Sequence, residues 1–368
     1  MTSPTNGQGE APEPATTVVL PAAQSQPRFA YGGQAVIEGV MIRGRQNLGL
    51  AIRGPDGKIH LHHEPLSTFY TGRIRRWPLV RGVIVLIETL VLGLRALQRS
   101  ANMAMADPDS GEDPQEISGW ALALTLVFSL VMGVGMFFVV PLGAVWALDP
   151  IIGSDLASEF IEGGFRLGIL ISYIWLIGLL PDVKRVFAYH GAEHMAVHAF
   201  EAGLPLIPAN VQKFSTPHPR CGTAFLLTVV LVSILVFALF SVVSSSWEWR
   251  ILSRILFIPV IAGFSYEIIR FSGAHQGTLA AKIMARPGLW LQRLTTRQPD
   301  DDQIEVAICA METAIAADGG REYEVAFLPR PARASWVTAK LETVEPAETV
   351  DISPQPEGNE DSGDESGS

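Results

Sequence analysis

The sequence predicts a mainly α-helical, polytopic membrane protein with about four transmembrane helices, one re-entrant or interfacial helix and a small cytoplasmic β-hairpin. Of the 368 residues, 48% are apolar and only 17% are charged, which is a high apolar content for a soluble chain of mixed structure. The apolar residues are also concentrated in a few long segments. We expect a membrane-embedded domain with cytoplasmic loops over residues 29–317, between a disordered N-terminal segment (1–28) and a mostly disordered acidic tail (318–368).

Four segments of the chain are apolar enough to cross a bilayer, whose hydrocarbon core needs about 20 residues of helix. They cover about residues 119–148, 163–180, 222–245 and 251–269. Basic residues favour the cytoplasmic side of short loops. The first connection (149–162) has four acidic residues and no Lys or Arg, whereas the second (181–221) has four basic residues. We therefore expect a multi-pass protein with both termini in the cytoplasm.

A fifth apolar segment, about residues 78–97, is shorter and contains Glu88. If it crossed the bilayer, the eight basic residues between 28 and 76 would lie outside, against the tendency of basic residues to stay inside. We favour a re-entrant or interfacial helix over a fifth crossing. In that case Glu88 faces protein or a polar cavity.

The soluble parts show shorter patterns. Residues 48–53 and 58–63 flank a Gly-Pro-Asp-Gly turn, which predicts a β-hairpin. Residues 303–317 carry apolar side chains on one helical face and predict an amphipathic helix. The glycines between residues 31 and 44 suggest tight backbone approach or turns, and Glu38 in that segment is either a cavity carboxylate or an ion-pair partner of Arg43.

The composition excludes some classes of protein. The net charge is −10, and residues 341–368, with nine acidic residues and no Lys or Arg, account for nine of these charges, so nucleic-acid binding has no support. Only two cysteines are present, Cys221 and Cys309, which argues against a disulfide framework and suits a reducing compartment. The N-terminus lacks the basic start and apolar core of a cleavable signal peptide, so we expect the membrane helices to direct insertion.

The most specific signal is the string His190-Gly-Ala-Glu193-His194, followed by His198. On a helix, His190 and His194 lie one turn apart on one face and can share a zinc ion at about 2 Å. The same His-x-x-Glu-His pattern occurs in the inverted zinc peptidases, where the glutamate polarises a water molecule at the metal. Further ligands must come from elsewhere in the chain.

The best local candidates for further ligands are His218 and Cys221, because imidazole and thiolate both suit zinc. All four residues would complete a tetrahedral structural site, whereas replacement of one by water would give a catalytic site. Glu267 is an alternative third ligand. An alternative interpretation needs no metal. In it the histidines form a hydrogen-bonded surface cluster, and Cys221 is a small buried hydrophobic residue.

Four strings resemble, in the same order, motifs of the YqhQ-like family of bacterial membrane proteins. They are Gly32-Gly-Gln-Ala-Val-Ile-Glu-Gly-Val-Met41, Tyr189-His-Gly-Ala-Glu-His194, His218-Pro-Arg-Cys-Gly222 and Pro299-Asp-Asp-Asp-Gln-Ile-Glu-Val-Ala307. The resemblance covers about residues 29–317. It implies an uncharacterised, predicted metal-dependent enzyme of the bacterial cytoplasmic membrane, and it supports the fold more than any catalytic activity.

Two functions follow as hypotheses. In the first, the chain is an inner-membrane protein with a zinc site on its cytoplasmic face and acts as a metal-dependent hydrolase. Glu193 is then the general base, Arg220 stabilises developing negative charge, and Glu38 or Glu267 orients the ligands. In the second, the chain is a non-catalytic scaffold or regulator that binds other membrane proteins, and the His/Cys cluster is structural. Transport is less favoured, because few charged residues fall within the four segments. The substrate and the oligomeric state stay open.

Overall fold

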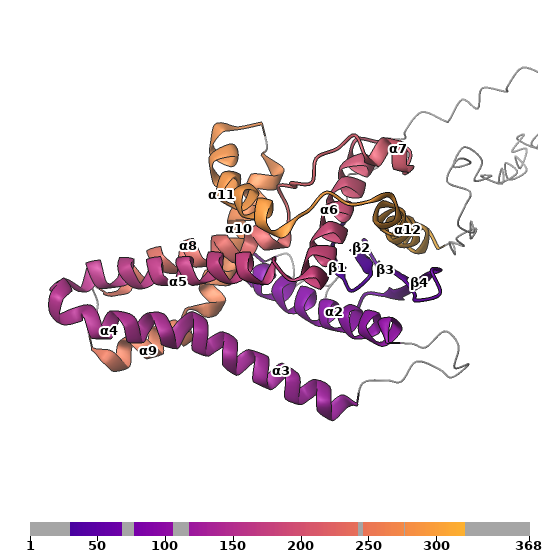
Figure 1. The fold of residues 1–368 in the computed structure, drawn as a ribbon. Coiled ribbons are helices and arrows are strands. Elements are labelled where there is room, and N and C mark those ends of the chain that lie inside the picture. The colour runs from indigo at the N-terminus through magenta and orange to yellow at the C-terminus, as the bar shows by residue number, and fades with distance from the viewer. Residues whose placement is uncertain (1–29, 68–76, 106–117, 242–245, 276, 321–368) are drawn as a thin grey trace, which may run out of the picture. The chain divides into compact units, whose positions relative to one another are not determined.

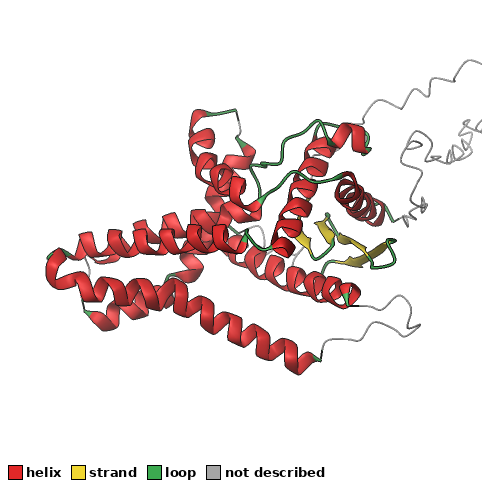
Figure 2. Ribbon diagram, viewed as in Figure 1, coloured by secondary structure: helices red, strands yellow, loops and turns green. Residues whose placement is uncertain are grey.

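The computed structural model describes residues 30–67, 77–105, 118–241, 246–275 and 277–320 (Figure 1). This part of the chain is mainly helical, with one four-stranded antiparallel sheet near its N-terminal end (Figure 2). The expected disordered segment (1–28) and nearly all of the expected acidic tail (318–368) lie outside the described residues.

The sheet is a meander in the order β1-β2-β3-β4, built from Gly32–Val36, Gly39–Arg43, Asn47–Arg53 and Ile59–Pro65. The expected hairpin is therefore confirmed as β3 and β4, paired with Ile52 opposite His60. The glycine-rich segment before it, expected to form turns or close backbone approaches, supplies β1 and β2, and a Cβ on Gly33 would lie 1.9 Å from the carbonyl oxygen of Met41. Its own tight turn falls at Glu38, whose φ of 51° is unusual for a residue with a side chain.

Helices cover both faces of the sheet because its apolar side chains alternate. Val40 and Ile42 face a core shared with α6 (Pro181–Glu201) and α12 (Asp301–Asp318), whereas Met41 faces α2 (Val80–Ala104). Gly49 allows α12 to approach β3 closely, since a Cβ there would lie 2.6 Å from the carbonyl oxygen of Ala310. The amphipathic helix expected at 303–317 is thus confirmed as α12.

The end of α12 also binds the turn between β2 and β3. The carboxylate of Asp318 accepts the backbone N–H groups of Arg45 at 2.5 Å, and of Gln46 and Asn47 at 2.9 Å each. It also accepts the hydroxyl of Tyr31 at 2.9 Å. Residues from the two ends of the described chain therefore close one compact core.

The apolar helices follow the expected segments with two differences. The first apolar helix is a continuous run of α3 (Gly119–Val134), the π-helix η2 (Gly135–Val139) and α4 (Val140–Ile152). The other apolar helices are α5 (Asp155–Ile177), α8 (Gly222–Ser241), and α9 (Trp247–Leu256) with α10 (Ile258–Ala274). Within the described residues, three helices are long and apolar enough to cross a membrane, or four if the pair α9 and α10, bent by 47°, is one span. The first difference is this bend, which falls just before Pro259, because proline cannot continue the hydrogen bonding of a preceding turn.

The second difference is that α5 begins eight residues before the expected span and includes Glu159 and Glu162. Both are buried, and Arg254 of α9 binds them through Nη2 at 2.7 and 2.6 Å. Arg166, one turn along α5, binds Glu162 at 2.6 Å and the carbonyl oxygen of Phe137 in η2 at 3.1 Å. We call Glu159, Glu162, Arg166 and Arg254 the ionic network. Its internal pairing explains how an apolar helix can contain two carboxylates.

Helix α2 covers the segment expected to be re-entrant or interfacial, and it does not meet the length and hydropathy test for a span. Its buried face, which includes Glu88 and Leu92, packs against the sheet and α10. Glu88 accepts a hydrogen bond from Nε of Arg43 at 2.9 Å, so it faces protein as expected. The alternative in which Arg43 pairs with Glu38 gives way to this contact.

Candidate metal centre

The candidate site is built on α6. Proline at the first helical position, Pro181, is favourable because the first N–H groups of a helix have no internal partner. At the other end Gly203 takes a φ of 71°, which stops the helix. The spacing of four places His190, His194 and His198 along one face.

Backbone carbonyls fix the tautomers of two of these rings. Nδ1 of His190 lies 2.8 Å from the carbonyl oxygen of Thr295, and Nδ1 of His194 lies 2.5 Å from that of Thr216. A carbonyl oxygen only accepts, so each Nδ1 carries the proton and each Nε2 keeps a lone pair. This is the arrangement that metal-binding histidines adopt, with the second ring nitrogen held by an outer partner.

Cys221 lies near both rings and completes a buried group of three possible ligands. Nε2 of His190 lies 3.1 Å from the Cys221 sulfur, and one ligand atom from each of His190, His194 and Cys221 lies within 4.8 Å of the others. Zinc bonds of about 2.0 Å to nitrogen and 2.3 Å to sulfur, in a tetrahedron, separate two nitrogen ligands by about 3.3 Å and a nitrogen from a sulfur by about 3.5 Å. The three residues therefore fit a zinc ion after small side-chain adjustments.

Burial favours the neutral forms of both Cys221 and His194. Burial raises the pKa of the Cys221 thiol to about 11, while the hydroxyl and N–H groups of Thr223, at 3.1 and 3.3 Å from the sulfur, act in the opposite direction. Burial, together with the neighbouring His190 and His218, holds the pKa of His194 well below its usual range. The imidazole therefore stays neutral, which metal binding requires.

Glu193 lies beside this group and is fully enclosed. Its Oε1 accepts the backbone N–H of Gly33 in β1 at 2.9 Å, and its Oε2 lies 3.5 Å from Nε2 of His194. Burial raises the pKa of Glu193, with His190, His218 and the Gly33 N–H acting against it. A carboxyl group with a raised pKa, close to a ligand cluster, has the character of a general base.

His218 belongs to a neighbouring group with His198 and Glu201. Its ring centroid lies 4.6 Å from that of His198 but 5.6 Å from that of His194. Its Nδ1 accepts the backbone N–H of Arg220 at 3.3 Å, so its Nε2 carries the proton and faces Glu201 at 3.5 Å. The four ligands expected together are thus divided, three in one group and His218 in the next.

The remaining expected residues lie on other partners. Arg220 pairs with Glu201. Glu267 on α10 binds the Arg81 guanidinium of α2 through Nε at 2.6 Å, and neither candidate ligand group among the described residues includes it. Glu38 binds Arg185 of α6 in a bidentate pair at 2.6 and 2.5 Å.

Several supporting residues have no signal in the sequence. Gln292 on α11 (Leu279–Thr295) accepts the backbone N–H of His218 at 2.7 Å and donates to its carbonyl at 2.9 Å, as a neighbouring strand would. The carbonyls of Thr216 and Thr295 are backbone atoms, which residue types do not reveal. Gly191 is different, because a Cβ there would lie 2.1 Å from the carbonyl oxygen of Arg297. The glycine within the His-x-x-Glu-His string is therefore a signal that could have been read.

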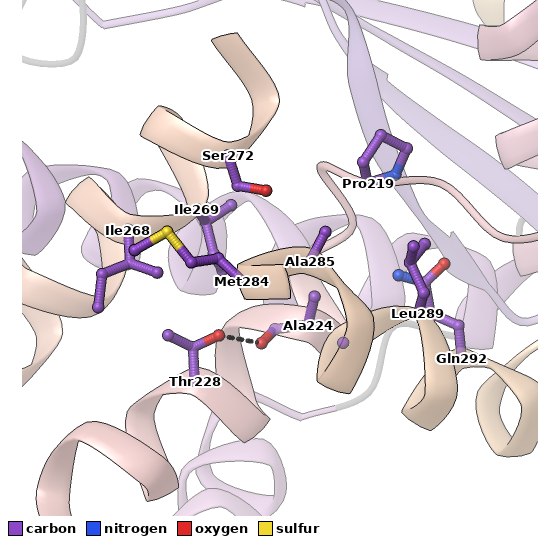
Figure 3. A pocket seen from close by; sticks show the side chains of 11 residues that line it. Pro219, Ala224, Thr228, Ile268, Ile269, Ser272, Met284, Ala285, Leu289 and Gln292 are labelled. Carbon is purple, nitrogen blue, oxygen red and sulfur yellow. Dashed lines mark hydrogen bonds between the residues drawn. The ribbon is translucent and has the colours of Figure 1, made fainter. Parts of the chain in front are cut away.

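A small, mostly aliphatic pocket lies beside Pro219, between α8, α10 and α11 (Figure 3). Its wall includes Pro219, Met284 and Ile269, and Gln292 separates it from His218. None of the three clustered ligands His190, His194 and Cys221 lines it. The candidate chemistry therefore lies outside this pocket.

Comparisons with known proteins give a family but no activity. The model of a family described as "Protein of unknown function (DUF1385)" matches residues 77–317. The chain is 36% identical over 293 residues to "Uncharacterized protein YqhQ" of Bacillus subtilis (strain 168), which covers 76% of this chain and 90% of that protein. No solved structure matches. The resemblance carried by the four motifs is thereby confirmed.

Proposed function

Because the chain belongs to the DUF1385 family, which includes YqhQ and whose name assigns no activity, we propose its function from the geometry of the site. The chain is an integral membrane protein of the bacterial cytoplasmic membrane with a zinc centre at His190, His194 and Cys221, and it acts as a metal-dependent hydrolase. The observation that carries this proposal is the buried group of His190, His194 and Cys221, in which the Nε2 atom of His190 lies 3.1 Å from the Cys221 sulfur.

The shared core supports four crossings. The sheet, α6 and α12 lie in one hydrophobic core, so all three lie on the same side of a membrane. The number of crossings between the sheet and α6, and between α6 and α12, must then be even. The run 119–152 and α5 supply two, which leaves α2 on the surface. Helix α8 supplies a third, so the bent pair α9 and α10 supplies the fourth.

The direction of insertion follows from charge. The α6 side carries Lys184, Arg185 and Lys213, whereas the ends of α4 and α5 that meet at residues 153–154 carry Asp149 and Asp155. Basic residues favour the cytoplasm, so the metal centre and both termini are cytoplasmic. Reporter fusions after residue 320 and within residues 153–154 test this, with activity of a cytoplasmic reporter expected only for the first.

Three protein ligands favour catalysis over a structural clip. Structural zinc sites close the tetrahedron with four protein ligands, whereas catalytic sites keep one position open. Nδ1 of His218 accepts the Arg220 N–H and its Nε2 carries the proton, so neither ring nitrogen offers a lone pair to a metal. His218 therefore supplies no fourth ligand. A divalent metal in this position supplies a Lewis acid that activates water for hydrolysis.

The chain's own residues would take the other roles. Glu193 is held by the Gly33 N–H with its second oxygen beside His194, where it can accept a proton from the attacking water. The carbonyls of Thr295 and Thr216 keep the two imidazoles in the tautomer that ligation needs. The apolar core around α6 keeps the centre buried, which strengthens each of these interactions.

Metal content tests the centre directly. We expect elemental mass spectrometry of the detergent-purified chain to find about one zinc per chain, and the His190→Ala/His194→Ala double variant to fall to background. The matched control is His60→Ala/His62→Ala, which removes two half-exposed imidazoles from β4 and should retain zinc. A folded, metal-free wild type would overturn the centre and favour a non-catalytic membrane scaffold.

Glu193→Gln separates catalysis from structure. The amide still accepts the Gly33 N–H, so the variant should keep its fold and its zinc while hydrolysis of model esters and phosphodiesters falls by about 100-fold or more. Equal activity in Glu193→Gln and wild type would remove the general-base role. No hydrolysis by either protein, with zinc retained in both, would favour a structural metal clip.

A further inference from the structure

Helix α11 has an exposed side that the proposed centre does not use. Its buried face, which includes Gly288, Leu291 and Gln292, packs on α8 and α10. The opposite side carries two parallel rows of exposed residues with the same spacing of four and seven. The apolar stripe consists of Leu279, Ile283 and Trp290, and the basic stripe consists of Lys282, Arg286 and Arg293.

The charge around α11 contrasts with that of the whole chain. Residues 271–298 contain no acidic residue and four basic ones, in a chain whose net charge is −10. Within the described part of the chain, no member of the basic stripe has a carboxylate within ion-pair distance. The three cations are therefore available to an anionic partner.

The pairing of the two stripes identifies the kind of partner. A helix with leucine, isoleucine and tryptophan on one side of its exposed face and lysine or arginine beside them lies in the plane of a membrane interface. A nucleic acid would use the cations but leave Leu279 and Ile283 exposed to water. Helix α11 itself is not among the candidate spans, yet it packs on α8 and α10, which are.

We propose that α11 is a membrane-surface helix that binds anionic phospholipids. The basic stripe contacts their headgroups, and the apolar stripe enters the boundary with the acyl chains. This inference rests on the spans of the proposed function, because α8 and α10 bring the bilayer to the side of α11.

The same helix also supports the metal centre. Arg293 precedes by two residues Thr295, whose carbonyl fixes the His190 ring at 2.8 Å. Residues two apart on a helix lie on different sides of it, so Arg293 is on the exposed side of α11, whereas Thr295 is buried on the side of the candidate ligands.

Lipid affinity tests the basic stripe. Each basic residue near an anionic surface contributes about fivefold in affinity, so Lys282→Gln/Arg286→Gln should raise the dissociation constant for phosphatidylglycerol roughly 25-fold. Native mass spectrometry of the detergent-purified full chain measures this constant, with phosphatidylcholine and inorganic phosphate as competitors. The charge-matched control Lys58→Gln/Lys213→Gln, with both exposed residues away from α11, should change it less than about twofold.

A change below about threefold in the α11 variant, an equal change in the control, or competition by inorganic phosphate alone would overturn the proposal. These outcomes leave zinc content unchanged, so they are distinct from failure of the metal centre. Size-exclusion profiles identical to wild type verify that each variant is folded.

Depth measurement tests the apolar stripe independently. A nitroxide at Trp290→Cys, in nanodiscs of phosphatidylglycerol and phosphatidylcholine, should collide more with oxygen than with a water-soluble nickel complex, and a nitroxide at Lys213→Cys should do the reverse. Cys221 and Cys309 are buried and should stay unlabelled. An aqueous profile at position 290, in a chain that alkaline carbonate does not extract, would overturn the inference and leave the spans standing.

Discussion

The candidate metal centre on α6 and the ionic network around α5 both bury polar side chains, but they differ in what they lack. In the network each charge has an opposite charge within 2.7 Å, and two carboxylates balance two guanidinium groups. In the centre, His190, His194 and Cys221 bring together three side chains of types that bind metals, with no opposite charges paired among them. A cluster that neutralises itself holds helices together, whereas a cluster of metal ligands is completed by a cation.

The two clusters should therefore respond differently to the loss of one side chain. Loss of one partner in the network leaves a buried charge without compensation, which is costly. Loss of one ligand from the centre leaves neutral groups, so the fold should survive while metal is lost. The following predictions test that separation, beginning with the largest effect.

Arg254→Gln should destabilise the protein by about 3–5 kcal/mol, because Glu159 and Glu162 lose the cation between them. Thermal unfolding in detergent measures the loss, and zinc content per folded chain should not change. Arg99→Gln is the control, since Arg99 is partly exposed and lies 3.7 Å from Glu64, where a surface pair contributes at most about 1 kcal/mol. Similar losses in both variants would contradict the importance of the network.

Cys221→Ser should weaken zinc binding by about 100-fold or more, which corresponds to about 2.7 kcal/mol or more. Competition with a chelator of known affinity measures it, and thermal unfolding of the metal-free variant should resemble that of metal-free wild type. Cys309→Ser changes the other buried cysteine, which lies in the core with α12, and should leave zinc affinity unchanged. Equal affinities in Cys221→Ser and wild type would remove Cys221 from the centre.

Asp318→Asn changes a carboxylate that is held by hydrogen bonds alone, and it should lower the free energy of unfolding by about 1–2 kcal/mol. Burial acts to raise the pKa of Asp318, but the N–H groups of Gln46 and Arg45 and the Tyr31 hydroxyl outweigh it, so the pKa lies below its ordinary value of 3.8. The contribution should therefore be present above pH 3.8 and decline as pH falls through the lower folded pKa. A difference between wild type and variant that persists unchanged to pH 2 would contradict this.

His218→Ala should have the smallest effect on zinc, less than about threefold in affinity, because its ring lies with His198 and Glu201 rather than in the centre. Its removal tests the division of the four expected ligands. A loss of zinc as large as that in Cys221→Ser would restore His218 as a fourth ligand and make the site structural.

The sequence predicted the parts of the fold and site that depend on local spacing. His190 and His194 fall one helical turn apart, and the zinc ligand types around them narrowed the search to Cys221 and His218. The hairpin of β3 and β4 was visible from its turn residues. The helix α12 was visible from its apolar period.

The rest depended on partners distant in the sequence. The start of α5 was missed because hydropathy counts Glu159 and Glu162 as polar, and the Arg254 that neutralises them lies more than ninety residues later. Whether His218 can bind a metal depends on which ring nitrogen carries the proton, and the backbone N–H of Arg220 sets this. Glu267 was a plausible ligand until its contact with Arg81 was known.

The close packing of β3 on α12 has a consequence for how the chain is made. The sheet ends at Pro65 and α12 begins at Asp301, so the ribosome adds more than 230 residues between them. At about 5–20 residues per second this takes roughly 12–50 s. During that time the apolar face of the sheet waits for its cover while the intervening helices are synthesised. The first folded element of the chain is therefore among the last to be completed, and its nascent form needs protection from aggregation.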